Sequence, residues 1–178
     1  MVLAGLAYPA ARAIAAERAR AMTREARDNV DLLFHGTAAH FALARPRLGA
    51  AAHRCPHPKD HPEGGAIAIT PPLTVRCADG PDGACTPSAS DRPGAYDPAL
   101  WNDPVWRGLG FRKLEGHRFH FAYEAVNLDD GYGACEFTVT ARADLDGDGV
   151  YSTYRRSGRA DQRGVRPTTP LVIDAPFE

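Results

Sequence analysis

The chain has 178 residues, of which 44% are hydrophobic, and a formal net charge of −1. This length and composition are sufficient to bury a core, and they predict a single domain. The near-neutral charge argues against a nucleic-acid partner, because a phosphate-binding surface normally shows a clustered excess of basic residues. The longest apolar stretch, residues 2–11, is about half the ~20 residues that a transmembrane helix needs, so the sequence predicts no complete membrane span.

Residues 10–44 are predicted to form one long amphipathic helix, because small and apolar side chains recur every three or four residues and so share one face. The members of this face are Met22, Ala26, Val30, Leu33, Thr37 and Phe41. Pro46 is expected to end the helix. At ~1.5 Å per residue the helix would be on the order of 50 Å long, which is more than a compact domain of this size can cover. We therefore expect residues 1–16, which are mainly apolar, to protrude; a core helix with a frayed start is the alternative.

Residues 46–104 show no regular period, and prolines and glycines recur through them. Only residues 66–70 and 73–76 are predicted to be short strands. A long irregular segment inside a compact domain needs to be held in place by something else, and three of the four cysteines lie within it.

The four cysteines are predicted to form two disulfides. Their spacing is irregular and contains no CxxC motif, which favours disulfides in an oxidising compartment over a structural metal site. Four cysteines allow three pairings. We favour Cys77 with Cys85, which would close a small loop rich in Gly, Asp and Pro, and Cys55 with Cys135.

Residues 117–127 and 134–143 are predicted to form an antiparallel hairpin. Each segment alternates between apolar and polar side chains, and Asp-Asp-Gly at residues 129–131 makes a turn between them. The apolar face of this hairpin consists of Phe119, Phe121, Tyr123, Ala125, Cys135, Phe137, Val139 and Ala141. This face needs a cover, and the later half of the N-terminal helix is the only long amphipathic element available.

A third strand is predicted at residues 150–156 and a short fourth strand at residues 171–174. The predicted fold class is therefore α+β, with a long helix in residues 1–45 packed on a three- to four-stranded antiparallel meander in residues 105–178. Between them, residues 46–104 would form a long irregular region held by disulfides.

The Asp-rich loop at residues 144–149, Asp-Leu-Asp-Gly-Asp-Gly, is a candidate calcium site. It places carboxylates at alternate positions before a glycine that permits a sharp turn, as in the first half of an EF-hand loop. The expected ligands are Asp144, Asp146 and Asp148, with the Val150 carbonyl and Ser152. Arg155 stands where an EF-hand has its bidentate glutamate, so calcium would be bound weakly and would be structural. An acidic β-turn without a metal is the alternative.

A second possible metal site combines His53, Cys55, His57 and His61 within nine residues. Such a group could hold zinc or another transition metal. Prolines stiffen this segment, and the ligands have no upstream partner at a recognised spacing. We favour a surface loop that carries a disulfide cysteine.

Taken together, the elements resemble those of a type IV pilin or pseudopilin. Residues 2–10 look like the second half of the apolar N-terminal pilin helix, including its proline. Residues 24–30, Arg-Glu-Ala-Arg-Asp-Asn-Val, look like the acidic-Ala-x-x-Asn stretch where that helix meets the globular head. Residues 106–111, 119–123 and 140–152 are similar to segments of pilin-like proteins of myxobacterial type. The resemblance rests on the order of these stretches, since none of them is specific alone.

This resemblance implies a structural subunit, major or minor, of an extracellular type IV pilus or type II secretion-like filament. Such a subunit is anchored in the inner membrane before assembly and then packs against other pilin subunits through its N-terminal helix. The residues expected to mediate assembly are Leu3, Leu6, Tyr8, Pro9 and Ile14. Family members begin with a charged leader, a cleavage site and an early glutamate, none of which stands before this apolar stretch, so we expect a pilin-like head with a stub of its membrane helix.

Two rival functions come from other classes. A secreted calcium-binding or recognition module would use the Asp-rich loop and the cysteine-rich segment as its working surface. An extracellular metal-dependent enzyme would use the histidine cluster. The sequence contains no GxSxG, HExxH, Walker or GxGxxG motif, so we predict that the protein is not an enzyme.

Overall fold

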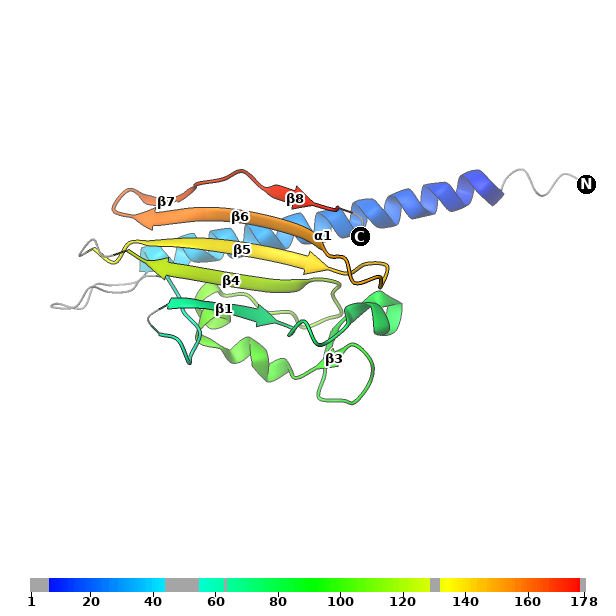
Figure 1. Cartoon of the computed structure of the whole chain (residues 1–178), viewed down its shortest axis with the longest axis horizontal. Coiled ribbons are helices and arrows are strands. Elements are labelled where there is room, and N and C mark those ends of the chain that lie inside the picture. Colours follow the sequence, from blue (N-terminus) through cyan, green and yellow to red (C-terminus); the bar gives the residue numbers. More distant parts are fainter. Residues whose placement is uncertain (1–6, 44–54, 63, 129–131, 177–178) are drawn as a thin grey trace, which may run out of the picture.

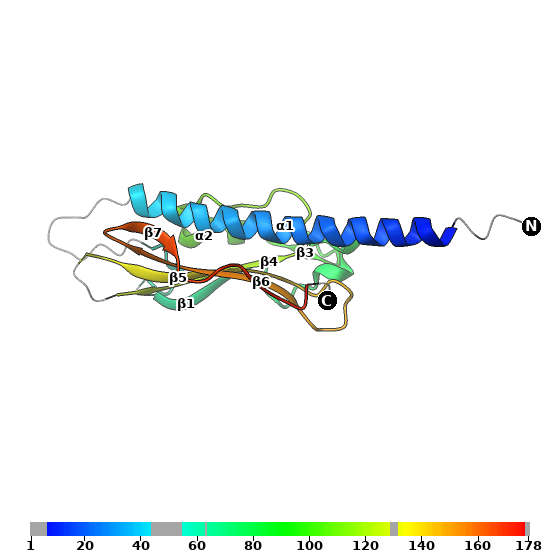
Figure 2. The same ribbon diagram turned by 90° about the horizontal axis from the view of Figure 1, so that it is seen from above.

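One long helix, α1 (Ala7–Leu43), lies along one face of an antiparallel sheet in this computed structural model (Figures 1 and 2). The predicted helix, residues 10–44, is confirmed, although the observed one begins three residues earlier and ends one residue earlier. The structure describes residues 7–43, 55–62, 64–128 and 132–176.

Six strands make up the main sheet in the described part of the chain, in the order β1-β4-β5-β6-β7, with β8 also paired to β6. All of these pairings are antiparallel. The strands are β1 (Gly64–Thr70), β4 (His120–Asn127), β5 (Cys135–Ala143), β6 (Ser152–Asp161), β7 (Gly164–Pro167) and β8 (Val172–Asp174).

The segment between β1 and β4 forms a second layer that shares the α1 side of the core. It contains a small parallel pair and several short helices. These elements are η1 (Cys77–Asp79), η2 (Pro81–Gly83), β2 (Thr86–Pro87), β3 (Ala95–Tyr96), η3 (Pro98–Asn102) and α2 (Pro104–Leu109). Asp97 and Asp103 cap η3 and α2, because each carboxylate accepts a hydrogen bond from the backbone N–H two residues later.

The predicted three- to four-stranded meander is too small. The predicted hairpin, the third strand and the short strand near residue 172 are present, and the third strand, β6, runs further than predicted. The strand predicted at residues 66–70 is also present as β1, but it joins the sheet as an edge strand beside β4, and β7 adds another edge strand beside β6. Strand β1 lies about fifty residues before its partner, so no local pattern reveals the pairing. Residues 73–76, predicted to be a strand, instead form a turn in which the Val75 N–H donates to the Pro72 carbonyl.

The core between α1 and the sheet contains the side chains that the alternation predicted. Ala26, Val30, Leu33, Thr37 and Phe41 are buried on the helix, while Met22 is only half-buried. The eight predicted residues of the hairpin face are all buried. Phe34, which was not predicted to face the sheet, packs on Phe137 with 5.2 Å between ring centroids. One core therefore joins the helix to the sheet.

A cluster of aromatic rings fills the space between α2, the sheet and the segment before α2. Trp101 lies 5.2 Å from Trp106 and 5.7 Å from Phe111, measured between ring centroids, and Phe111 lies 5.1 Å from Phe121. The Trp106 Nε1–H donates to Thr70 Oγ1 of β1 at 2.8 Å. This contact attaches the edge strand to the middle segment.

The N-terminal turns of α1 extend beyond the sheet and its loops, as the length of the predicted helix implied (Figures 1 and 2). Among the side chains that the structure describes, Ala26 is the first buried one along the helix. The helix therefore has a covered half and a free half, and their boundary lies near residue 22.

Candidate functional site

Three of the residues predicted to mediate assembly, Tyr8, Pro9 and Ile14, belong to the free half of α1. Leu3 and Leu6 lie outside the described residues. Tyr8 and Pro9 belong to the helix, so the proline stands in its first turn, where a missing backbone N–H costs no hydrogen bond. Ile14 is 57% exposed. The exposed Ile14 side chain therefore projects from a part of the helix that contacts neither the sheet nor α2.

Two polar residues of α1, Glu25 and Asn29, hold the helix on the rest of the domain. They stand one turn apart, and the Asn29 Nδ2–H donates to the Glu25 carbonyl at 2.6 Å. Glu25 Oε1 accepts the backbone N–H of Arg118 at 3.0 Å, and its Oε2 lies 3.6 Å from Arg118 Nη1. Lys113 Nζ donates to Asn29 Oδ1. These residues lie in the stretch of residues 24–30, where the helix was expected to meet the rest of the domain.

Further along α1, Asp31 and Phe34 both contact Arg156 of β6. The Arg156 Nη1 donates to Asp31 Oδ1 at 2.8 Å, and the guanidinium carbon lies 4.3 Å from the Phe34 ring centroid. The same side chain thus combines an ion pair with a cation–π contact. Polar contacts therefore fix the rotation of the helix about its own axis on both sides of the buried face.

Both disulfides form with the pairing favoured from the sequence. Cys55 bonds to Cys135 across a separation of 80 residues and ties the start of the middle segment to β5. Cys77 bonds to Cys85 across a separation of 8 residues and closes the loop that contains η1 and η2. Such bonds persist in oxidising environments, which indicates a secreted or extracellular setting.

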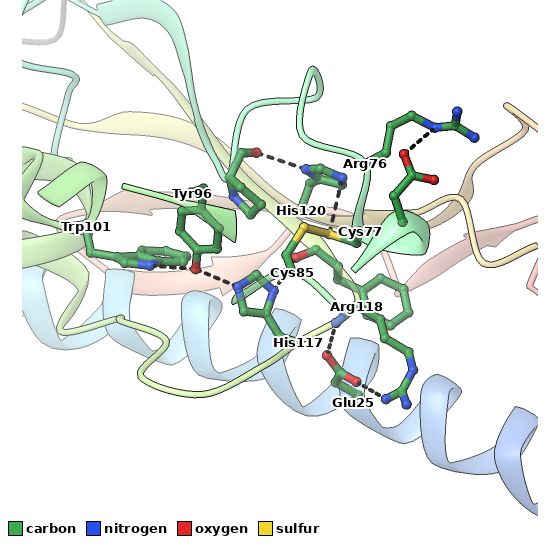
Figure 3. The surroundings of a disulfide bond; sticks show 12 residues. Glu25, Arg76, Cys77, Cys85, Tyr96, Trp101, His117, Arg118 and His120 are labelled. Carbon is green, nitrogen blue, oxygen red and sulfur yellow. Dashed lines mark hydrogen bonds and ion pairs between the residues drawn. A yellow bond between two sulfur atoms is a disulfide. The ribbon is translucent and has the colours of Figure 1, made fainter. Parts of the chain in front are cut away.

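Two buried histidines flank the Cys77–Cys85 disulfide (Figure 3). The His120 Nδ1–H donates to the Pro71 carbonyl at 2.9 Å, while its Nε2 lies 3.7 Å from Cys77 Sγ. Burial lowers the pKa of His120. The sulfurs of Cys77 and Cys85 lie close enough to the His120 ring to form a metal-binding group, but both are consumed by the disulfide.

The second histidine, His117, ends a buried chain of hydrogen bonds that the sequence analysis missed (Figure 3). Its Nδ1–H donates to the Phe119 carbonyl at 2.8 Å, so Nε2 accepts the Tyr96 hydroxyl at 2.7 Å. That hydroxyl in turn accepts the Trp101 Nε1–H at 3.0 Å. Burial lowers the pKa of His117 to about 4 and raises the pKa of Tyr96 to about 12, so both groups are neutral at pH 7.

The structure weakens the zinc hypothesis for the histidine cluster. Cys55 is oxidised and cannot act as a thiolate ligand. His57 is buried and its Nε2 lies 2.9 Å from Asn127 Oδ1, whereas His61 is exposed. His53 lies outside the described residues.

The Asp-rich loop, residues 144–149, brings its three predicted carboxylates together. One oxygen from each of Asp144, Asp146 and Asp148 lies within 4.8 Å of the other two. Asp144 organises the turn, because its Oδ1 accepts the Gly147 N–H at 2.7 Å and its Oδ2 accepts the Gly149 N–H at 3.1 Å. Both glycines have positive φ, of 85° and 93°, which residues with a side chain rarely adopt.

Two shorter turns inside the loop satisfy further backbone groups. Asp146 Oδ1 accepts the Asp148 N–H at 3.2 Å, and Asp148 Oδ1 accepts the Val150 N–H at 2.7 Å. A carboxylate has about four lone-pair sites, so each aspartate keeps capacity for a cation. The Arg76 Nη2 donates to the Gly147 carbonyl at 3.1 Å and connects the loop to the segment before η1.

The remaining predicted ligands differ in availability. Val150 is 49% exposed, next to the three aspartates. Ser152 is fully buried at the start of β6, where its hydroxyl donates to the Ala175 carbonyl at 2.6 Å. The arrangement therefore offers three carboxylates and the Val150 backbone as candidate ligands, and it assigns Ser152 to packing between β6 and the C-terminal segment.

No protein-family model, curated protein or solved structure matches this chain. Within the described residues, no helix has the length and apolar character needed to cross a membrane.

Proposed function

We propose that the chain is a pilin-like structural subunit of an extracellular filament, assembled through the free half of α1. The observation that carries this proposal is the division of one continuous helix into a half that is packed on the sheet and a half that extends past it. A long helix is stabilised mainly by packing of its apolar face. The free half of α1 has no such packing within the domain, so we infer that a partner covers it.

Further support comes from the way the helix is attached. Glu25, Asn29 and Asp31 hold α1 in one orientation, so the free half is presented by a rigid domain. The two disulfides suit a protein that works outside the cell. The partner that the pilin resemblance implies is the free half of α1 in other copies of the same chain.

The test compares two exposed apolar residues on the same helix. Ile14 is 57% exposed on the free half, and Leu32 is 59% exposed on the covered half. Ile14→Asp should abolish concentration-dependent self-association in sedimentation equilibrium, while Leu32→Asp should leave it unchanged. Circular dichroism checks that both variants fold. If the parent chain stays monomeric at every concentration, or if both variants associate as the parent does, the free half is not an assembly surface.

A second candidate function is weak structural binding of calcium by the Asp-rich loop. Its support is the convergence of three carboxylates on a turn that is already shaped by the backbone. Calcium would then stiffen the connection between β5 and β6 without taking part in chemistry.

A further inference from the structure

The sheet face opposite α1 carries a groove with a volume of about 370 Å³. This volume lies in the range of about 300–1,000 Å³ that is usual for small-molecule sites. The groove runs across β4, β5 and β6, and eight of its eleven lining residues are polar. They include Arg142, Arg155, Thr138, Thr140, Thr153 and Ser157, together with one carboxylate, Glu124. Two guanidiniums against one carboxylate leave the lining with a net positive charge.

Strand register places these side chains in adjacent rows on one face. Arg142 pairs with Thr153, Thr140 pairs with Arg155, and Thr138 pairs with Ser157. Directly paired residues lie side by side on the same face of a sheet. Because Arg156 reaches α1, its neighbour Arg155 points to the other face, where the groove lies.

The centre of the groove is hollow because its middle row is built from small residues. Ala122 pairs with Thr140, so two short side chains occupy the floor beside the longer Arg155. Larger side chains at these two positions would fill the space between the arginines. The hydroxyls of Thr138 and Ser157 form a hydrogen bond of 3.0 Å at one end of the floor.

The two arginines of the groove differ from three other arginines of β6 and β7. Arg156, Arg159 and Arg166 each form an ion pair with an aspartate or a glutamate. Within the described part of the chain, Arg142 and Arg155 form no such pair. An anion in the groove could therefore pair with their terminal guanidinium N–H groups.

We propose that this groove binds a small ligand that bears both an oxyanion and hydroxyl groups, which is the chemistry of an acidic sugar. The guanidiniums of Arg142 and Arg155 would hold the oxyanion, since arginine presents several N–H donors in a geometry that matches carboxylates and sulfates. The threonine and serine hydroxyls, which both donate and accept, would pair with the hydroxyls of the ligand. The site lies away from α1 and does not depend on filament assembly.

The test is isothermal titration of the full chain with three probes. Glucuronate carries both chemical features, glucose carries only the hydroxyls, and sulfate carries only the oxyanion. We expect glucuronate to bind at least about tenfold more tightly than either of the other probes. Absence of glucuronate binding at about 10 mM would overturn the proposal. Equal binding of sulfate and glucuronate would overturn the assignment of a sugar.

Variants locate the binding. Arg142→Gln and Arg155→Gln should each weaken glucuronate binding by about tenfold or more, and Thr140→Val should weaken it by a smaller factor. Arg112→Gln, at an exposed arginine outside the groove, is the control and should bind as the parent does. If Arg142→Gln does not fold, the exposed Arg155 still decides the question. Undiminished binding by Arg155→Gln and Thr140→Val would place the ligand elsewhere.

Discussion

Gly36 of α1 lies directly against the backbone carbonyl of Leu109, the last residue of α2. A Cβ atom at position 36 would stand 2.4 Å from the Leu109 oxygen and 3.2 Å from its carbonyl carbon. A glycine inside a helix normally costs ~1 kcal/mol relative to alanine. Here the missing side chain allows two helices to approach, so the contact explains the glycine.

Gly36→Ala should therefore destabilise the protein, although alanine is the better helix former. The close contact is with backbone, which cannot rotate away, and overpacking of this kind costs about 1–3 kcal/mol. Chemical denaturation measures the change. Ala39→Gly, at an exposed position one turn later, is the control for helix propensity alone. If Gly36→Ala raises stability by as much as Ala39→Gly lowers it, α2 does not press on α1 at this point.

Removal of the Leu33 or Phe121 side chain tests whether helix and sheet share one core. Both residues are fully buried, one on α1 and one on β4. Leu33→Ala and Phe121→Ala should each lower the free energy of unfolding by about 2–5 kcal/mol. Leu32→Ala, at the exposed neighbour, should change it by less than about 0.5 kcal/mol. Unmoved denaturation midpoints in both core variants would mean that the two elements fold separately.

The elements predicted correctly from the sequence are those marked by a pattern of apolar residues within one continuous segment. The period of α1 and the alternation from Phe119 to Ala141 each reflect one face turned to the core. The positions of β1 and of the Trp101, Tyr96 and His117 chain depend on contacts between distant segments, and no spacing in the sequence encodes them. The groove that contains Arg142 and Arg155 was not predicted for the same reason, because only the strand register brings these two arginines together.

The two disulfides should contribute unequally to stability. In the chain-entropy model the gain grows with loop length, which gives about 4.5 kcal/mol for the 80-residue separation of Cys55 and Cys135 and about 2.5 kcal/mol for the 8-residue separation of Cys77 and Cys85. Paired Cys→Ala variants of each bond, compared by denaturation, test this order. Thiol titration of the denatured parent should find no free cysteine; four reactive thiols in protein from an oxidising compartment would contradict both bonds.

Burial of His117 should make stability fall in mild acid. The folded pKa of about 4 lies below the unfolded value of 6.5, so the unfolded chain binds a proton first. The stabilisation from the neutral ring is complete above pH 6.5, and it is lost as the pH falls toward 4, by an amount on the order of 3 kcal/mol.

The variant His117→Gln isolates this contribution. Burial lowers the pKa of His40 and His120 as well, and both histidines remain in parent and variant, so their contributions cancel in the comparison. Denaturation of both proteins at several pH values should show a shallower decline for His117→Gln between pH 6.5 and 4. Parallel curves would show that His117 titrates normally in the folded protein.

Calcium should raise the thermal midpoint of the protein by a few degrees. The carboxylates of Asp144, Asp146 and Asp148 converge in one loop and repel one another, so a cation between them would stabilise the folded state. Because Arg155 takes the place of a bidentate glutamate and Ser152 is engaged by Ala175, we expect a dissociation constant of about 10⁻⁴ to 10⁻³ M. At about 10 mM calcium this affinity adds about 1.4 to 2.7 kcal/mol by mass action.

The measurement is thermal unfolding in calcium and in chelator, for the parent chain and for two variants. Asp146→Ala removes one candidate ligand, and its midpoint should be the same in both conditions. Asp91→Ala, at an exposed aspartate outside the loop, should respond to calcium as the parent does. Magnesium at the same concentration separates specific binding from ionic screening, since it requires a stricter octahedral geometry. If calcium and chelator give equal midpoints in the parent, the three aspartates serve only the hydrogen bonds of the turn, and the free half of α1 remains the feature that defines the function.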